Sequence, residues 1–135
     1  MIMSKVSDTT QYIKIFDYLK KVPEAELCDF GTFIVMCEQG RSYTVTIEDE
    51  IVAILCMYET NKRVFVAHMH IQNGYRRSKV LLELYKKIVG YSSDKKKKVY
   101  TTMDDISTIK NTLIPADVLE GGDVLYRIDT SRSML

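Results

Sequence analysis

Residues 41–71 carry the pattern that most restricts the fold of this chain. The segment RSYTVTI alternates polar and apolar residues, with Tyr43 and Val45 on one face, and this period of two is typical of a strand with one buried face. The acidic turn 48–50 leads into IVAILCMYE, a continuous apolar run that suits a buried strand. A second turn at 61–62 leads into RVFVAHMHIQ. The sequence therefore predicts an antiparallel meander of strands joined by tight turns.

The third of these strands carries both histidines of the chain. Strict alternation over 64–71 predicts two faces. One face holds Val64, Val66, His68 and His70, and the other holds Phe65, Ala67, Met69 and Ile71.

Helical spacing of apolar residues marks two helices. TTQYIKIFDYLKKV predicts a first amphipathic helix that follows the possible caps Asp8 and Thr9 and stops before Pro23. SKVLLELYKKIVG predicts a second helix over 78–89, with Gly90 as its C-terminal stop. AELCDFGTFIVMCEQG is ambiguous, because its short apolar run fits either the end of a helix or a loop with a strand.

The order of elements indicates a mixed α/β (α+β) fold. Strand 64–71, helix 78–89 and strand 98–103 form a β-α-β unit, for which a right-handed crossover is expected. DISTIKNTL predicts a short helix capped by Asp104 or Asp105, and DVLYRID predicts a final strand after a Gly-Gly turn.

Length and composition indicate one ordinary globular domain over 1–135, with frayed ends at 1–8 and 130–135. The three cysteines are an odd number without metal-ligand spacing, which favours a reducing compartment and a cytoplasmic location. No apolar run reaches the length of a membrane span, and the N-terminus lacks the order of a signal peptide. The formal net charge of +1 argues against a global basic field for nucleic acid. The lysine run 95–98 is expected to be a solvated loop, and Glu59 a solvated hairpin residue.

Three cations stand where the helix 78–89 should begin, namely Arg76, Arg77 and Lys79. Positive charge is disfavoured at the positive end of a helix dipole. Two interpretations follow. In the first, the side chains bind a phosphate-rich ligand, with guanidinium groups engaging its oxygens. In the second, they are simply solvated.

The order helix, meander, β-α-β crossover, short helix and final strand resembles the GCN5-related N-acetyltransferase (GNAT) superfamily over about residues 9–129. The most telling passage is IEDEIVAILCMYETNKRVFVAHMHIQNGYRRSKVLLELYKKIVG. The resemblance implies a GNAT-like mixed sheet with flanking helices. The chain resembles a small, divergent, phage-type member of the superfamily with a degenerate acetyl-CoA loop.

In that family an Arg/Gln-x-x-Gly-x-Gly/Ala turn holds the pyrophosphate of acetyl-CoA at a helix N-terminus. Arg76 falls on the first position of this pattern, while Lys79 and Leu81 stand at the two small positions. The resemblance implies that acetyl-CoA, as co-substrate, is bound by Ile71, Arg76, Arg77, Ser78 and Lys79.

Transfer to an amine needs a general base and a proton donor for the thiolate. His70 is the candidate base, because a near-neutral intrinsic pKa suits that role and it lies near the end of its strand. DISTIKNTL contains no tyrosine, so the family's usual donor is missing, and Tyr100 is the candidate acid if it lies across from His70. His68 is expected to serve packing. Packing of both histidines under the sheet is the alternative, and no metal site is expected.

Three functions remain open from the sequence. The first is an N-acyltransferase that moves acetyl from acetyl-CoA to an unknown amine or protein acceptor. The second is a pseudo-enzyme, a GNAT-fold binding module that grips a host protein and is either virus-encoded (from a bacteriophage, acting in the host cytoplasm) or an accessory protein. The third, a nucleic-acid binder using Arg76, Arg77, Lys79 and the run 95–98, lacks interleaved stacking aromatics. No membrane partner is expected. Activity, acceptor, acyl group, oligomeric state and source are left open.

Overall fold

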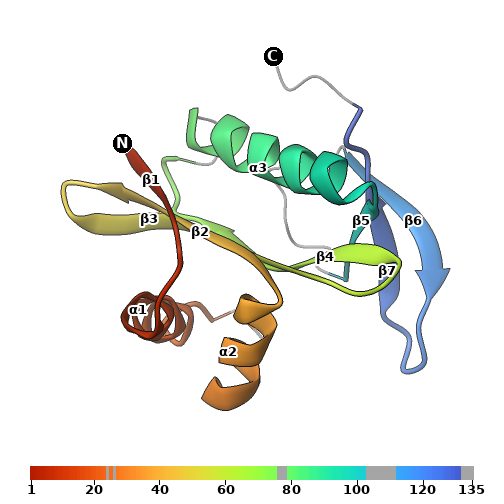
Figure 1. Ribbon diagram of the computed structural model, residues 1–135, viewed down its shortest axis with the longest axis horizontal. Helices are drawn as coiled ribbons and strands as arrows, with labels where there is room; N and C mark the ends of the chain where they lie inside the picture. Colours follow the sequence, from red (N-terminus) through yellow and green to blue (C-terminus); the bar gives the residue numbers. More distant parts are fainter. Residues whose placement is uncertain (24, 26, 76–78, 103–111, 132–135) are drawn as a thin grey trace.

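The computed structural model describes residues 1–23, 25, 27–75, 79–102 and 112–131 of the chain. In these residues a seven-stranded sheet has the strand order β1-β2-β3-β4-β5-β7-β6. Helix α3 lies on one face of the sheet, and α1 and α2 lie on the other (Figure 1). The elements in chain order are β1 (Ile2–Lys5), α1 (Thr9–Leu19), α2 (Phe30–Glu38), β2 (Gly40–Ile47), β3 (Glu50–Glu59), β4 (Arg63–Ile71), α3 (Lys79–Lys95), β5 (Lys98–Thr101), β6 (Leu113–Val118) and β7 (Val124–Ile128).

The predicted meander and crossover are confirmed. Strands β2, β3 and β4 pair antiparallel in sequence order, and β4 pairs parallel with β5 after the α3 crossover. The final strand, β7, inserts between β5 and β6. Strand β6 was not predicted, since most of its residues are exposed and its sequence LIPADV has no clear alternation. The predicted short helix of DISTIKNTL and its caps fall almost wholly on 103–111, outside the described residues.

The ambiguous segment before the meander forms a helix, α2. Asp29 caps it, and its carboxylate accepts the backbone N–H of Thr32 at 3.0 Å. Asp8 caps α1 in the same way, accepting from the backbone N–H of Gln11 at 2.9 Å. Acidic side chains are favourable here because they satisfy free N–H groups at the helix start.

Two predicted boundaries were wrong. Residues 1–8 were expected to fray, but Ile2–Lys5 pair with β2 along the sheet edge. Gly90 was expected to stop the helix, but α3 continues past it to Lys95. The helix ends where Lys96 adopts a left-handed φ of 54° and Ser92 Oγ donates to the Lys97 carbonyl at 2.6 Å. A glycine inside a helix is tolerated when neighbouring residues supply the packing.

Two apolar clusters hold the layers together. The cluster under α3 combines side chains of this helix with side chains of β2, β3, β4, β5 and β7. Its helix members include Leu84 and Ile88, both 0% exposed. The cluster under α1 and α2 includes Ile15, Phe33 and Ile54, also 0% exposed. The sheet is therefore buried on both faces along β3, which explains the continuous apolar run of that strand.

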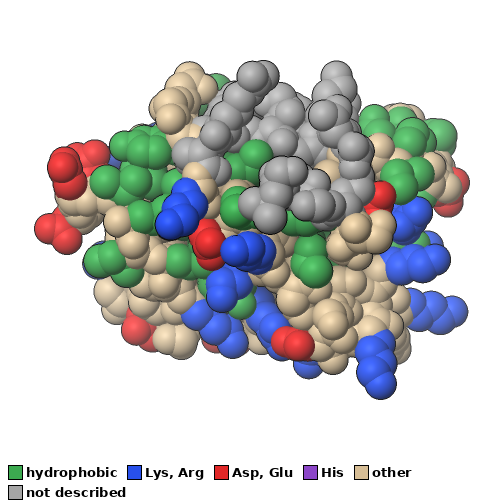
Figure 2. All heavy atoms as spheres, turned by 90° about the horizontal axis from the view of Figure 1, so that it is seen from above, with side chains coloured by type: hydrophobic (Ala, Val, Ile, Leu, Met, Phe, Trp, Pro, Cys, Tyr) green, Lys and Arg blue, Asp and Glu red, His purple; other side chains and the backbone are tan. Residues whose placement is uncertain are grey.

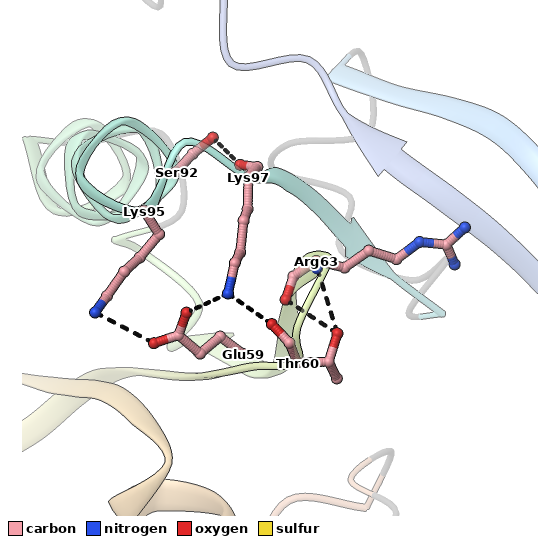
Figure 3. A network of polar contacts seen from close by, with 6 residues as sticks. All are labelled: Glu59, Thr60, Arg63, Ser92, Lys95 and Lys97. Carbon is pink, nitrogen blue, oxygen red and sulfur yellow. Dashed lines mark hydrogen bonds and ion pairs between the residues drawn. The ribbon is translucent and has the colours of Figure 1, made fainter.

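A polar network joins the β3–β4 turn to the end of α3 (Figure 3). The carboxylate of Glu59 forms ion pairs with Lys97 at 2.8 Å and Lys95 at 3.3 Å. Lys97 also donates to the Thr60 carbonyl at 2.7 Å. The expectation of a solvated Glu59 was therefore wrong, because its carboxylate is paired and partly buried. Of the lysine run, Lys97 is also partly buried, whereas Lys95, Lys96 and Lys98 are exposed as expected, with Lys95 in α3. Burial and the nearby Glu59 raise the pKa of Tyr91 to about 12.

The α3 face carries charges of both signs. Figure 2 looks down on this face and shows Lys and Arg side chains with acidic side chains among them. On α3, for example, Lys86 pairs with Glu83 at 3.5 Å. Among the described residues, this mixture agrees with the small net charge of the chain.

Candidate active site

Strands β4 and β5 part in the middle of the sheet. Their parallel pairing joins Arg63–Phe65 with Lys98–Tyr100 and goes no further in the described residues. Strand β4 continues to Ile71, paired with β3 on its other side. Beyond this pairing, the Thr101 hydroxyl donates to the Val66 carbonyl at 3.0 Å. The second half of β4 therefore offers a backbone edge that β5 does not cover.

A β-bulge lies at this point of β4. Cys56 faces His68 and Met57 faces Val66, which leaves Ala67 as the extra residue. The predicted faces of the strand were therefore wrong. Val64 and Val66 point to the α3 side together with Met69 and Ile71. The extra residue shifts the alternation by one, so the histidines point to the opposite side, toward α1 and α2.

His68 is packed beneath α2. It is 7% exposed, and its ring lies 6.1 Å from the ring of Phe33. Burial lowers its pKa, because a charged imidazole would lose its hydration. This environment agrees with the packing role predicted for His68.

His70 points to the same side of β4 as His68 but lies nearer the end of the strand, where it lines a pocket. Its ring centroid is 5.6 Å from that of Tyr18 on α1. The pocket has a volume of about 460 Å³ and opens between the end of α1 and the end of β4. Its lining consists of Tyr18, Lys21, Val22, Pro23, His70, Gln72 and Asn73. A histidine in a pocket of mixed polarity is suited to proton transfer with a small polar group.

Tyr18 and Gln72 form the polar wall of this pocket. The Gln72 backbone N–H donates to the Val52 carbonyl at 2.9 Å, and its side-chain Nε2 donates to the Ile51 carbonyl at 3.1 Å. Burial raises the pKa of the Tyr18 phenol, and a hydrogen bond with the Gln72 side chain offsets part of that rise. Tyr18 therefore carries its proton at neutral pH.

Tyr100 is not across from His70. It pairs with Phe65, five positions earlier on β4 and hence roughly 15 Å away along the strand. The Arg63 guanidinium lies 4.5 Å from the centre of the Tyr100 ring. The centre of the Phe65 ring lies 6.2 Å from the centre of the Tyr100 ring. The expected partnership with His70 was wrong because the parallel pairing of β4 and β5 ends before the strand reaches the histidine.

The predicted cofactor residues are only partly described. Ile71 is 4% exposed and packs in the cluster under α3. Lys79 is the exposed first residue of α3, and Arg76, Arg77 and Ser78 lie outside the described residues. Leu81, at one of the two small positions of the family pattern, is 9% exposed and belongs to the core. The large Leu81 side chain therefore packs in the core.

Sequence reasoning missed the α1 side of the pocket. Tyr18, Lys21 and Gln72 stand in segments that were read only as helix, helix end and turn. No motif marks them, because they meet only when α1 packs against the end of β4. In the residues that the structure describes, no group of three or more His, Cys, Asp or Glu side chains could hold a metal ion. No described helix has the length and apolar character that crossing a membrane requires.

No family model and no curated protein matches the chain. Solved structures do match over nearly its whole length. A GNAT-family acetyltransferase from Staphylococcus aureus Mu50 aligns with a TM-score of 0.69 and 12% identity, over 94% of this chain and 98% of that one. Arabidopsis thaliana Naa50, in complex with the bisubstrate analogue CoA-Ac-MVNAL, aligns with a TM-score of 0.71 and 11% identity, over 95% and 97%.

A third structure, an aminoglycoside 6'-acetyltransferase of type Ii, aligns with a TM-score of 0.69 and 11% identity, over 98% of this chain and 99% of that one. The chain therefore has the fold of the GNAT acetyltransferases, as its sequence resemblance predicted. These neighbours differ in what their names say they bind or acetylate, a peptide-like analogue in one case and an aminoglycoside in another. The fold alone does not choose the acceptor.

Proposed function

We propose that this protein is an N-acyltransferase that moves an acetyl group from acetyl-CoA to a primary amine. The observation that carries the proposal is the parting of β4 and β5 beside a pocket that contains His70. Where β5 leaves β4, an extended amide chain would have room to lie beside the strand. GNAT-fold neighbours solved with acetyl-CoA or a CoA-containing analogue support this choice of co-substrate.

The residues present fit acetyl-CoA in two respects. The half of β4 that does not pair with β5 would hold the amide-containing arm of the molecule. The start of α3, with Lys79 and the preceding Arg76, Arg77 and Ser78, would hold the pyrophosphate, since helix N-termini and cations both favour anions. Ile71 would contribute through its place at the end of β4. Acetyl-CoA supplies an acetyl group already activated as a thioester.

The chain itself would supply proton transfer and exclusion of water. His70 would take the proton of the attacking amine, which must be neutral to form the new bond. The apolar side chains of Val22 and Pro23 line the same pocket and would limit access of water to the amine. Proteins and small molecules with a primary amine are both possible acceptors.

Two measurements test this function. Calorimetry with acetyl-CoA should give saturable binding, and a thiol-release assay with a panel of amines and peptides should give turnover. His70→Gln should lower turnover roughly 10²-fold or more while leaving acetyl-CoA affinity unchanged. Binding without turnover for any acceptor would favour the alternative of a catalytically inactive binding module. Absence of binding would exclude the acetyltransferase.

A further inference from the structure

The pocket that holds His70 contains a second titratable ring, the phenol of Tyr18. It is the one tyrosine among the described residues that line the pocket. The segment DISTIKNTL contains none, and Tyr100 pairs with β4 far from His70. Acetyl transfer requires a donor for the leaving sulfur as well as a base for the amine. Tyr18 is therefore the described side chain best placed to be that donor.

The position of Tyr18 is held by its own helix. Its neighbours Ile15 and Leu19 are 0% and 1% exposed and anchor α1 in the cluster beneath the sheet. Tyr18 itself is half-buried, and its ring is tilted by 58° against the ring of His70 at 5.6 Å. A ring anchored in this way loses little further freedom when a ligand contacts its hydroxyl.

The Gln72 side chain lies beside the Tyr18 hydroxyl. This side chain is fixed by donation from Nε2 to the Ile51 carbonyl at 3.1 Å. The Gln72 side chain lies close enough to the phenol to lower its pKa. A protonated phenol can donate its proton while its oxygen accepts from a neighbouring group. Burial, the larger effect, keeps that proton in place at neutral pH.

We propose that Tyr18 is the proton donor to the leaving sulfur, acting opposite His70 in the same pocket. This inference rests on the proposed acetyl transfer. His70 takes the proton that the amine loses as its nitrogen bonds to the acetyl carbon. Tyr18 gives its proton to the sulfur, which keeps the electron pair of the broken carbon–sulfur bond. His70 then returns a proton to the Tyr18 oxygen, so that an amide and a thiol are released and both side chains are restored.

The return of a proton from His70 is needed for an energetic reason. A thiol is ordinarily a stronger acid than a phenol, with pKa values of about 8.5 and 10. Transfer from Tyr18 alone would therefore be uphill, whereas the imidazolium is a stronger acid than either group. The two ring centroids lie 5.6 Å apart, and one water molecule between the hydroxyl and the imidazole would carry the proton.

The test combines turnover with a binding measurement that needs no turnover. In Tyr18→Phe, kcat should fall about 10²-fold with little change in the KM of the amine. At a pH of about 9, where a thiol is largely ionised, the wild-type protein should bind CoA about tenfold more tightly than desulfo-CoA. Tyr18→Phe should lose this preference, because the hydroxyl that contacts the sulfur is gone.

Two further variants serve as a matched control and as a test of coupling to Tyr18. Tyr12→Phe removes a hydroxyl from the same helix at a buried position outside the pocket, so it should keep both kcat and the preference for CoA. Gln72→Met should lower kcat by less than Tyr18→Phe and should cause no further loss when the two are combined, as expected of side chains that act as a unit.

The outcomes separate this inference from the proposed function. Unchanged kcat and an unchanged preference for CoA in Tyr18→Phe overturn the assignment. So does a rise in the KM of the amine alone, which would make Tyr18 an acceptor contact. A wild-type protein that prefers CoA through Tyr18 but acetylates no amine supports the contact with sulfur and overturns the transfer. A wild-type protein that does not bind CoA overturns both.

Discussion

Single residues of this protein differ in how their surroundings control protonation. His68 and His70 stand two positions apart on the same face of β4, yet one lies under α2 and the other lines a pocket. A histidine in a closed apolar site loses hydration when charged, while one in a polar pocket can exchange protons with a ligand. The two side chains should therefore affect different properties, His68 the stability of the fold and His70 the chemistry.

His68 should make folding stability depend on pH. Its pKa is lowered in the folded state by burial, so the unfolded chain binds more protons below the ordinary value of about 6.5. The unfolding free energy should therefore fall as the pH drops through about 6.5 and stay level above it. In His68→Phe, chemical denaturation at a series of pH values should show a smaller slope there.

The comparison for this experiment is His70→Gln, which keeps His68 and should keep its part of the slope. An unchanged slope in His68→Phe would mean that the pKa of the imidazole is the same in the folded and unfolded states.

The tip of the β2–β3 hairpin is strained at two residues. Ile47 pairs with Glu50, and the two residues between them, Glu48 and Asp49, have φ values of 52° and 65°. A two-residue turn of this kind prefers Asn-Gly, because glycine and asparagine tolerate positive φ. The double change Glu48→Asn and Asp49→Gly should raise the unfolding free energy by about 1 kcal/mol.

Thermal or denaturant unfolding measures this gain. Glu50→Gln removes a neighbouring charge at a strand position outside the turn and should change stability much less. Equal gains in both proteins would assign the effect to charge repulsion in the acidic tip.

At the scale of elements, two glycines show that the space available for a side chain differs between a strand and a helix. A Cβ on Gly40, at the start of β2, would lie 1.8 Å from the Met57 carbonyl oxygen, whereas a Cβ on Gly90, inside α3, would meet nothing within 4 Å. Gly40 is therefore required by the close approach of two strands. Gly90 only weakens the helix in which it stands.

Opposite effects of alanine are expected at these two sites. Gly90→Ala should raise the unfolding free energy by roughly 0.5–1 kcal/mol, because alanine restricts the unfolded chain and favours helix. Gly40→Ala should lower it by about 2 kcal/mol or more, since backbone atoms cannot move aside easily. Denaturant titration compares both with the wild type. A stabilising Gly40→Ala would contradict the close packing of β2 on β3.

The whole molecule brings together two sites that come from different layers. The pocket with His70 lies toward α1, and the start of α3 lies on the opposite face of the sheet (Figure 1). The parting of β4 and β5 connects the two, because both lie at the end of β4 that β5 leaves uncovered. A long ligand with an anionic end and a reactive end fits such an arrangement.

Removal of the cations before α3 should weaken CoA binding. Each charge-assisted hydrogen bond contributes about 1.5–3 kcal/mol, so Arg76→Ala with Arg77→Ala should reduce affinity at least tenfold in calorimetry. Folding stability should hardly change, because cations at a helix start are unfavourable to the helix dipole.

The charge-matched control is Lys5→Ala with Lys14→Ala, both exposed and outside the pocket. An equal loss of affinity in the two double variants would show a general effect of net charge. No loss in either would leave Arg76 and Arg77 as solvated residues.

The sequence by itself determined the elements whose pattern is local. Alternation identified the meander, helical spacing identified α1 and most of α3, and Asp8 marked the start of α1. Together these predicted the sheet order around the crossover and, with it, the fold. Such patterns can be read because one face of each element is buried and the spacing of apolar residues records that face.

The tertiary structure alone decided which side chains meet. The bulge at Ala67 reversed the face of the histidines, and the parallel register placed Tyr100 beside Phe65. Tyr18 entered the site only through the packing of α1 against the end of β4. A one-residue shift in a strand and a contact between distant segments leave no periodic trace in the sequence, because each depends on the partner strand or helix.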